Sequence, residues 1–278
     1  MAERAMRGAV SPSVLLYAPR ERARGAGRAA FPRRRARLVV VRAADEFAAG
    51  FRAALVDAAL VDVAAPTEDT WRAAALARDF PSIPFFALAP GRPTDGPALA
   101  RCAALDFVDV VVDGVDDGVM RELVGPHLFS RRFADALRDP PPALDLTSPT
   151  QVHTWRCVVA HAGRLVRTSA LAAALGVTRE HLSRTFAAGG APNLKRVIDL
   201  VRLLAAAELA KNPGYDIRDV ARVLGFASSS HLSSTAQRVV GTRPASLARL
   251  RTVDLVDRFA QGRGRSRPGE GNARRAGA

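Results

Sequence analysis

Two short runs of hydrogen-bonding side chains carry most of the chemistry that this sequence suggests. Each run begins two or three residues after a glycine, Gly176 or Gly225. A guanidinium can bond guanine O6 and N7 together, whereas short serine hydroxyls discriminate poorly between bases. The candidate nucleic-acid contacts are Thr178, Arg179, Glu180, His181, Ser183 and Arg184 in the first run, Ser228, Ser229, Ser230, His231, Ser233 and Ser234 in the second, and Arg238 and Arg243 beyond it. We expect the first run to read sequence, chiefly through its arginine at 184, and the second mainly to hold phosphates.

Both runs belong to a pattern that occurs twice. The triplet His-Leu-Ser lies at 181–183 and again at 231–233, and in each copy a helical segment and a glycine come before it. Glycine adopts the left-handed conformation that ends a helix without strain, and Thr178 and Ser228 or Ser229 can cap the helix that follows. Each copy is therefore predicted to form a helix-turn-helix.

One long helix is predicted between the two copies, from Asn193 to Ala210. Its apolar residues recur with helical spacing, Asn193 is a good N-terminal cap, and Pro213 and Gly214 follow its end. Eighteen residues at about 1.5 Å each give a spacer of roughly 27 Å, close to the length of one DNA turn. We expect the two reading helices to reach successive major grooves on one side of a duplex.

This stretch resembles the DNA-binding domain of AraC/XylS-type transcription regulators, over about residues 150–251. The residues that match the closing signature of the family are Ala221, Leu224, Gly225, Phe226, Ser230, Gly241 and Pro244. The departures from it are Leu232, Ser234, Ala236 and Gln237, which replace Phe, Arg, Phe and Lys. The resemblance implies two recognition helices joined by the long helix. Arg202 matches a family arginine that we interpret as a structural ion-pair former.

The charge distribution favours a polyanionic partner for the same half of the chain. The 278 residues carry a net charge of +14. Residues 1–140 hold 20 Lys and Arg against 18 Asp and Glu, whereas residues 141–278 hold 21 against 9. The basic half is the half with the repeated motif, as expected for binding to double-stranded DNA.

The first half alternates apolar runs with helical stretches and predicts an α/β domain with a five-stranded parallel sheet covered on both faces. The expected strands are Val14–Ala18, Arg37–Arg42, Ala59–Ala64, Ile83–Ala89 and Phe107–Val112. The expected helices are Arg20–Ala30, Asp45–Asp57, Glu68–Asp79, Asp95–Leu105 and Asp117–Leu137. The second half is predicted to be all-α, with a first helix at about Gln151–Ala162 whose Trp155 serves as a packing anchor.

This α/β half resembles a response-regulator receiver domain, through Val61–Pro66 and Ser82–Leu88. Asp62 corresponds to the phosphoacceptor. The positions that would hold Mg²⁺ read Ala18-Pro19-Arg20, and Ala89 and Asp113 replace the expected hydroxyl and lysine. Mg²⁺ must neutralise the phosphoryl oxygens during transfer. The resemblance therefore implies a degenerate receiver whose Asp62 is not regulated by phosphorylation and instead ends a strand or caps a turn.

Other chemistry receives less support from the sequence. The acidic residues Asp109, Asp113, Asp116 and Asp117 lack the ligand register of a calcium loop and are interpreted as a solvated turn at a helix N-terminus. No Gly-rich phosphate loop follows the first strand, and no Ser/His/Asp arrangement can be assembled. We therefore expect no enzyme activity, metal or cofactor, although the strand ends could hold a small ligand.

The expected domain organisation follows from these patterns. Residues 1–138 form the receiver-like domain, 139–149 a stiff Pro-rich linker, 150–252 the DNA-binding domain and 253–278 a basic disordered tail. Without a membrane-spanning run or a signal-peptide core, and with two cysteines that fit no metal site, the protein is expected to be cytoplasmic.

The leading hypothesis is a sequence-specific transcription regulator that binds double-stranded DNA. A nonspecific or architectural DNA binder is one alternative, given the serine-rich second run. A protein-interaction adaptor with a degenerate helix-turn-helix is the other. A small-molecule effector, RNA polymerase and a second copy of the chain are further partners that the sequence leaves open, and no membrane partner is expected.

Overall fold

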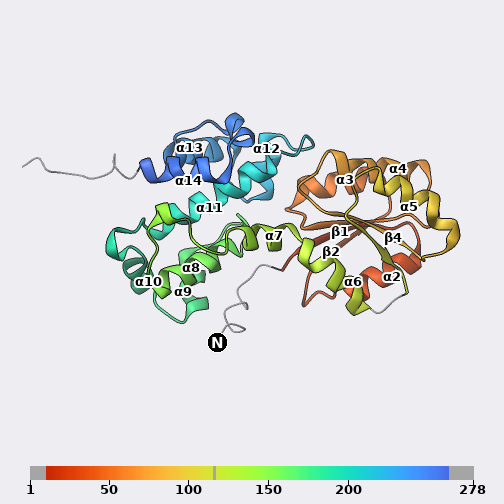
Figure 1. The fold of residues 1–278 in the computed structure, drawn as a ribbon, viewed down its shortest axis with the longest axis horizontal. Coiled ribbons are helices and arrows are strands. Elements are labelled where there is room, and N and C mark those ends of the chain that lie inside the picture. Colours follow the sequence, from red (N-terminus) through yellow and green to blue (C-terminus); the bar gives the residue numbers. More distant parts are fainter. Residues whose placement is uncertain (1–10, 115–116, 263–278) are drawn as a thin grey trace, which may run out of the picture.

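The computed structural model describes residues 11–114 and 117–262, and the side chain of residue 117 is not described. An α/β half and an all-α half lie end to end (Figure 1). This is the predicted fold class. Among the described residues, no helix combines the length and apolarity needed to cross a bilayer.

The α/β half is built on a five-stranded sheet that is parallel throughout, with strand order β2-β1-β3-β4-β5. Its strands are β1 Ser13–Tyr17, β2 Arg37–Val41, β3 Ala58–Asp62, β4 Phe85–Ala89 and β5 Asp109–Val112. Every residue of β1, β3 and β4 is buried, as expected for strands covered on both faces. The order is that of flavodoxin-like and receiver folds.

Helices cover both faces of this sheet (Figure 1). The bounds are α2 Glu21–Ala30, α3 Ala44–Ala53, α4 Glu68–Ala75, α5 Gly96–Ala103 and α6 Asp117–Val124. Helices α2 and α6 pack on one face, and α3, α4 and α5 pack on the other. The prediction of a single helix over 117–137 is wrong, because the chain forms two helices there. Helix α6 ends before a 3₁₀ turn at Gly125–His127, where Pro126 cannot continue the helix, and α7 follows at Phe129–Ala136.

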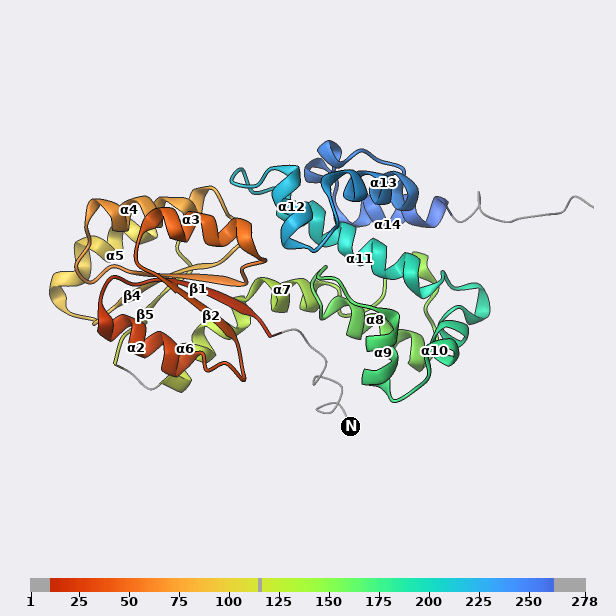
Figure 2. The ribbon, with the colours of Figure 1, turned by 180° about the vertical axis from the view of Figure 1, so that it is seen from behind.

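The all-α half contains seven α-helices among the described residues. They are α8 Pro149–Val159, α9 Thr168–Leu175, α10 Arg179–Phe186, α11 Leu194–Leu209, α12 Ile217–Val223, α13 Ser229–Val240 and α14 Thr252–Gln261. Helix α11 is the long central helix, and Asn193 caps it by accepting the Arg196 N–H at 2.9 Å. Helices α10 and α12 lie at opposite ends of α11 (Figure 2), whereas α13 packs along α11, where Arg238 pairs with Asp199.

Two predicted segment boundaries need correction. The expected disordered tail is wrong for residues 253–261, because Thr252–Gln261 forms α14 and buries Leu255, Val256 and Phe259. The rest of that tail, 263–278, lies outside the described residues. The Pro-rich segment 139–149 is not a free spacer either. It contains a 3₁₀ turn at Pro142–Leu144, and Leu144 and Leu146 are buried in the core.

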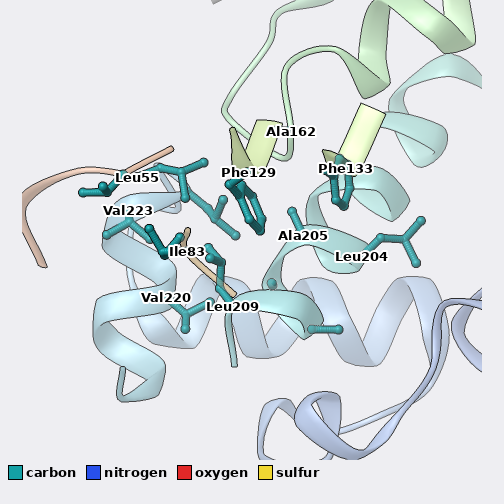
Figure 3. Close-up of a cluster of buried hydrophobic side chains, with 14 of the residues drawn as sticks. Leu55, Ile83, Phe129, Phe133, Ala162, Leu204, Ala205, Leu209, Val220 and Val223 are labelled. Atoms are coloured by element: carbon teal, nitrogen blue, oxygen red, sulfur yellow. The ribbon is translucent and has the colours of Figure 1, made fainter. Parts of the chain in front are cut away.

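One hydrophobic core runs through both halves of the molecule (Figure 3). In this core Leu55 and Ile83 of the α/β half meet Phe129 of α7 and Val223 of α12. Trp155 is fully buried in α8, and its indole N–H donates to the Leu137 carbonyl at 2.8 Å. Helix α7 and the segment after it therefore bridge the two halves by apolar packing.

Buried polar contacts reinforce this junction. Asp57, fully buried at the amino end of the sheet, accepts hydrogen bonds from the Ser13 N–H at 2.7 Å and the Ser130 N–H at 3.0 Å. It also forms a 2.5 Å ion pair with Arg164, which follows α8. The Tyr215 hydroxyl donates to the Phe51 carbonyl at 3.1 Å. The junction thus connects the amino end of the sheet to Arg164, and helix α3 to the loop that precedes α12.

Candidate nucleic-acid interface

Helix α10, the first of the two predicted reading helices, forms as the sequence predicts. The Thr178 hydroxyl accepts the His181 N–H at 3.2 Å and caps the helix, and Gly176 ends α9 with a φ of 69°. Leu182 and Phe186 are buried, so the opposite face points to solvent. The exposed face carries Arg179, Glu180, His181, Ser183 and Arg184.

The second reading helix, α13, is built in the same way but presents a weaker set of donors. The Ser228 hydroxyl caps it by accepting the His231 N–H at 3.0 Å. The Ser233 hydroxyl donates to the Ser229 carbonyl at 2.9 Å, and the Ser234 hydroxyl donates to the His231 carbonyl at 3.1 Å. Both donors are used within the helix, so these serines offer mainly acceptors to a partner.

A groove of about 590 Å³ joins the two reading helices. Arg179 and Ser183 of α10 and His231 and Arg238 of α13 line the same groove, together with Lys195 near the start of α11. Exposed side chains of both helices therefore face the same groove. A second hollow, beside the start of α10, is lined by Thr178, His181 and Arg184. The remaining candidates, which line neither space, are Glu180, Ser228, Ser229, Ser230, Ser233, Ser234 and Arg243.

Several groove residues were missed from the sequence. Arg167, Thr168 and Ser169 precede or begin α9, and Lys195 and Asp199 lie on α11. The cap at Asn193 could have placed Lys195 in the exposed first turn of α11. Nothing local marked residues 167–169, because their position depends on how α9 packs against α8 and α10.

Ion pairs in this groove differ from expectation. Asp199 pairs with Arg238 at 2.9 Å, so this predicted phosphate contact is held by an internal carboxylate. The guanidinium of Arg202 lies 3.7 Å from the centroid of the Phe226 ring and donates to the Leu224 carbonyl at 3.2 Å. Burial lowers the pKa of Arg202, and Asp199 opposes that shift. The role of Arg202 is structural, but ring stacking and a carbonyl replace the ion pair we expected.

The carboxyl edge of the sheet holds a closed charge cluster instead of an open phosphorylation site. Arg20 donates to both Asp62 oxygens through Nε at 2.9 Å and to Asp113 through Nη2 at 2.7 Å. Both carboxylates are about 2% exposed. Burial, the largest single effect, would lower the pKa of Arg20, but its hydrogen bonds to Asp62 and Asp113 and the charges of both carboxylates together raise that pKa. A cation thus lies after β1 and an anion after β5.

The solvated acidic turn is wrong for Asp113, whose buried carboxylate belongs to this cluster. Asp109 accepts its neighbour's N–H at 2.7 Å, Asp116 lies outside the described residues, and the side chain of Asp117 is not described. Within residues 11–114 and 117–262 no group of three or more His, Cys, Asp or Glu side chains is arranged to hold a metal ion.

Comparisons with known proteins match part of the second half to one family model. Residues 171–249 match the model of a helix-turn-helix domain. No curated protein matches the chain. Among solved structures, full-length FixJ from B. japonicum is similar at 12% identity and a TM-score of 0.36, over 82% of this chain and 97% of that chain.

Proposed function

We propose that this protein is a sequence-specific transcription regulator that inserts α10 and α13 into successive major grooves of DNA. The observation that carries the proposal is the shared groove, which exposed side chains of both helices line with Lys195 between them. Helix α11, which has sixteen residues and is about 24 Å long, lies beside this groove and packs against α13. It is proposed to hold α10 and α13 so that both reach major grooves about one DNA turn apart.

The two helices are proposed to contribute unequally. Arg184 projects from the exposed face of α10 and lines the hollow beside the start of that helix. An arginine so placed can bond guanine O6 and N7 together, for about 1–3 kcal/mol of discrimination. The hydroxyls of Ser233 and Ser234 donate within α13, so these short side chains are poor readers of bases. Helix α13 is instead proposed to hold phosphates through the backbone N–H groups at its N-terminus.

A pair of single variants tests this asymmetry. DNA sites are first selected in vitro with the full-length protein. Arg184→Ala should then weaken binding to the selected site by roughly 5–150-fold, corresponding to about 1–3 kcal/mol, and broaden sequence preference at one position. Ser234→Ala should change either quantity little. Equal losses from the two variants would reject the asymmetry, and absence of any enriched site would reject sequence-specific binding.

A nonspecific DNA binder is the second candidate, because the engaged serine hydroxyls of α13 weaken base reading by that helix. Titration with salt separates the two functions. A sequence-specific regulator keeps a large affinity ratio between selected and random DNA at fixed salt, whereas a nonspecific binder shows a ratio near one. Little binding to either DNA would favour the adaptor.

The α/β half is proposed to be a receiver-like module that works without phosphorylation. Arg20 holds the Asp62 carboxylate in the buried cluster, where a phosphodonor would have to displace it. A small-molecule effector, RNA polymerase and a second copy of the chain are proposed as partners of this half. A hollow of about 360 Å³ beside β3 and α5, lined by Trp71, Asp95 and Arg101, is the place to test for an effector.

A further inference from the structure

A second basic groove borders the proposed DNA surface beyond the helix-turn-helix match. It measures about 720 Å³ and lies between α11, α13 and α14. The cations that line it are Lys195, Arg196, Arg238 and Arg258. Its other polar lining residues are Asn193, Gln237 and Gln261. No carboxylate lines it among the described residues, although α14 carries Asp254 and Asp257.

This groove is continuous with the groove between the reading helices. Lys195 and Arg238 line both spaces. His231, near the start of α13, lines only the first groove, and Gly241, just after its end, lines only the second. The first groove therefore lies beside the start of α13, between it and α10, and the second lies beside the end of α13, next to α14. Duplex DNA presents this pattern to an inserted helix, because a phosphate backbone borders the major groove on each side.

Helix α14 holds the new cations in place. Phe259 is fully buried, and the guanidinium of Arg196 lies 4.9 Å from the centroid of its ring. Asp254, the carboxylate one turn before Arg258, is paired with Arg251 at 3.1 Å. Arg258 is exposed, so its charge is available at the groove.

We propose that the groove formed by α11, α13 and α14 binds the DNA phosphate backbone on the outer side of α13, with Arg196 and Arg258 as contacts. This inference rests on the proposed function and extends it to α14, a helix outside the matched residues 171–249. These contacts add affinity without sequence information, because phosphates are the same in every sequence.

The test uses the full-length double variant Arg196→Gln/Arg258→Gln and its Arg258→Gln single counterpart. Affinities for selected and random duplex DNA are measured from 50 to 200 mM salt. Each lost phosphate contact should reduce the slope of log affinity against log salt by about 0.9, so the double variant should lose about 1.8. Affinity for both DNAs should fall by the same factor, roughly tenfold or more at 100 mM salt, with the sequence preference unchanged.

The matched control is Arg33→Gln/Arg34→Gln, which removes two exposed arginines of the α/β half that line neither groove. It should leave the slope unchanged. Because Arg196 packs on Phe259, the single Arg258→Gln variant tests the proposal without that contact, and should lose about 0.9 of the slope. If the wild-type protein binds DNA and both Arg258 variants keep its slope, the α14 contact alone is overturned. A wild-type protein that binds no DNA would overturn both proposals.

Discussion

Arg20 shows how one side chain can change the chemistry of a site. Its guanidinium bonds to both Asp62 and Asp113, which lie at the ends of non-adjacent strands β3 and β5. A buried carboxylate is costly unless it is paired. Here Arg20 pairs with both carboxylates, and the Nε of Arg22 lies 3.3 Å from Asp113. Two guanidinium groups thus balance the charge of the two aspartates.

Replacing Arg20 should convert the cluster into a cation site. Arg20→Ala leaves two buried carboxylates whose oxygens both lay within 2.7 Å of one Nη2 atom, so we expect a loss of about 3–5 kcal/mol in stability. Mg²⁺ or Ca²⁺ should restore part of this loss, since oxygen ligands suit both ions. Thermal unfolding with and without each ion measures the effect.

The control for this prediction is Arg72→Ala. Arg72 pairs with Asp45 and Asp69 on the exposed surface, so its loss should change stability by less than about 1 kcal/mol and create no response to cations. The prediction is contradicted if Arg20→Ala is as stable as the wild type, or if neither Mg²⁺ nor Ca²⁺ raises its stability.

Helix α14 is an element whose stability depends on one aromatic side chain. Phe259 is fully buried and is covered by Arg196 of α11. We expect Phe259→Ala to lower the free energy of unfolding by about 3–5 kcal/mol, because a large buried ring leaves a cavity. Chemical denaturation measures this loss. The control is Val253→Ala on the same helix, whose side chain is 50% exposed and whose loss should have little effect. If Phe259→Ala and Val253→Ala both cause equally small losses, α14 is only loosely attached.

His161, just after α8, gives this element a dependence on pH. Its Nδ1 donates to the Cys157 carbonyl at 2.8 Å, and burial lowers its pKa, with Arg164 adding to the shift. Below the unfolded pKa of about 6.5 the unfolded chain binds a proton more readily than the folded chain. The contribution of His161 to the free energy of unfolding should therefore be fully present above that pH. It should be lost as pH decreases from the unfolded pKa to the lowered folded pKa.

The variant His161→Asn tests this, since asparagine keeps a donor near the Nδ1 position but does not titrate. Free energies of unfolding measured at pH 7.5 and 5.0 should differ less in the variant than in the wild type. His153→Asn, at an exposed position of α8, is the control and should keep the wild-type dependence. An unchanged pH dependence in the His161 variant would exclude this histidine as the source.

At the scale of the whole molecule, the two halves are joined by a shared core and a buried ion pair. The Asp57 carboxylate lies at the amino end of the sheet, opposite the carboxyl edge that holds Arg20. Arg164 directly precedes Leu165, where the groove between the reading helices begins. A change in how the halves dock would therefore act on the proposed DNA surface through this segment.

We expect Asp57→Asn to weaken this docking. The substitution leaves the charge of Arg164, a side chain only 14% exposed, without its partner, which costs about 3–5 kcal/mol for a buried pair. Calorimetry should show one unfolding transition in the wild type and two in the variant, as the halves unfold separately. Arg52→Gln, which removes a pair with Asp219 from a half-exposed arginine, is the control and should keep one transition. A single unshifted transition in Asp57→Asn would contradict coupling through this residue.

Much of the fold could be predicted from the sequence, because the signals are local. Fully buried strands appear as continuous apolar runs, and β1, β3 and β4 lie within one to two residues of their expected limits. Caps at Thr178, Asn193 and Ser228 formed where hydroxyl and amide side chains precede helices. These features depend on neighbours within about four positions, so the order of residues along the chain determines them.

The remaining features were decided only by tertiary structure. Arg20 and Asp113 are 93 residues apart, and no local pattern indicates that they form one buried cluster. The segment that forms α14 is short and carries three charges, yet it is ordered because its apolar face packs against α11 and α13. A buried charge needs a partner and a short helix needs a surface, and both come from parts of the chain that only folding brings close.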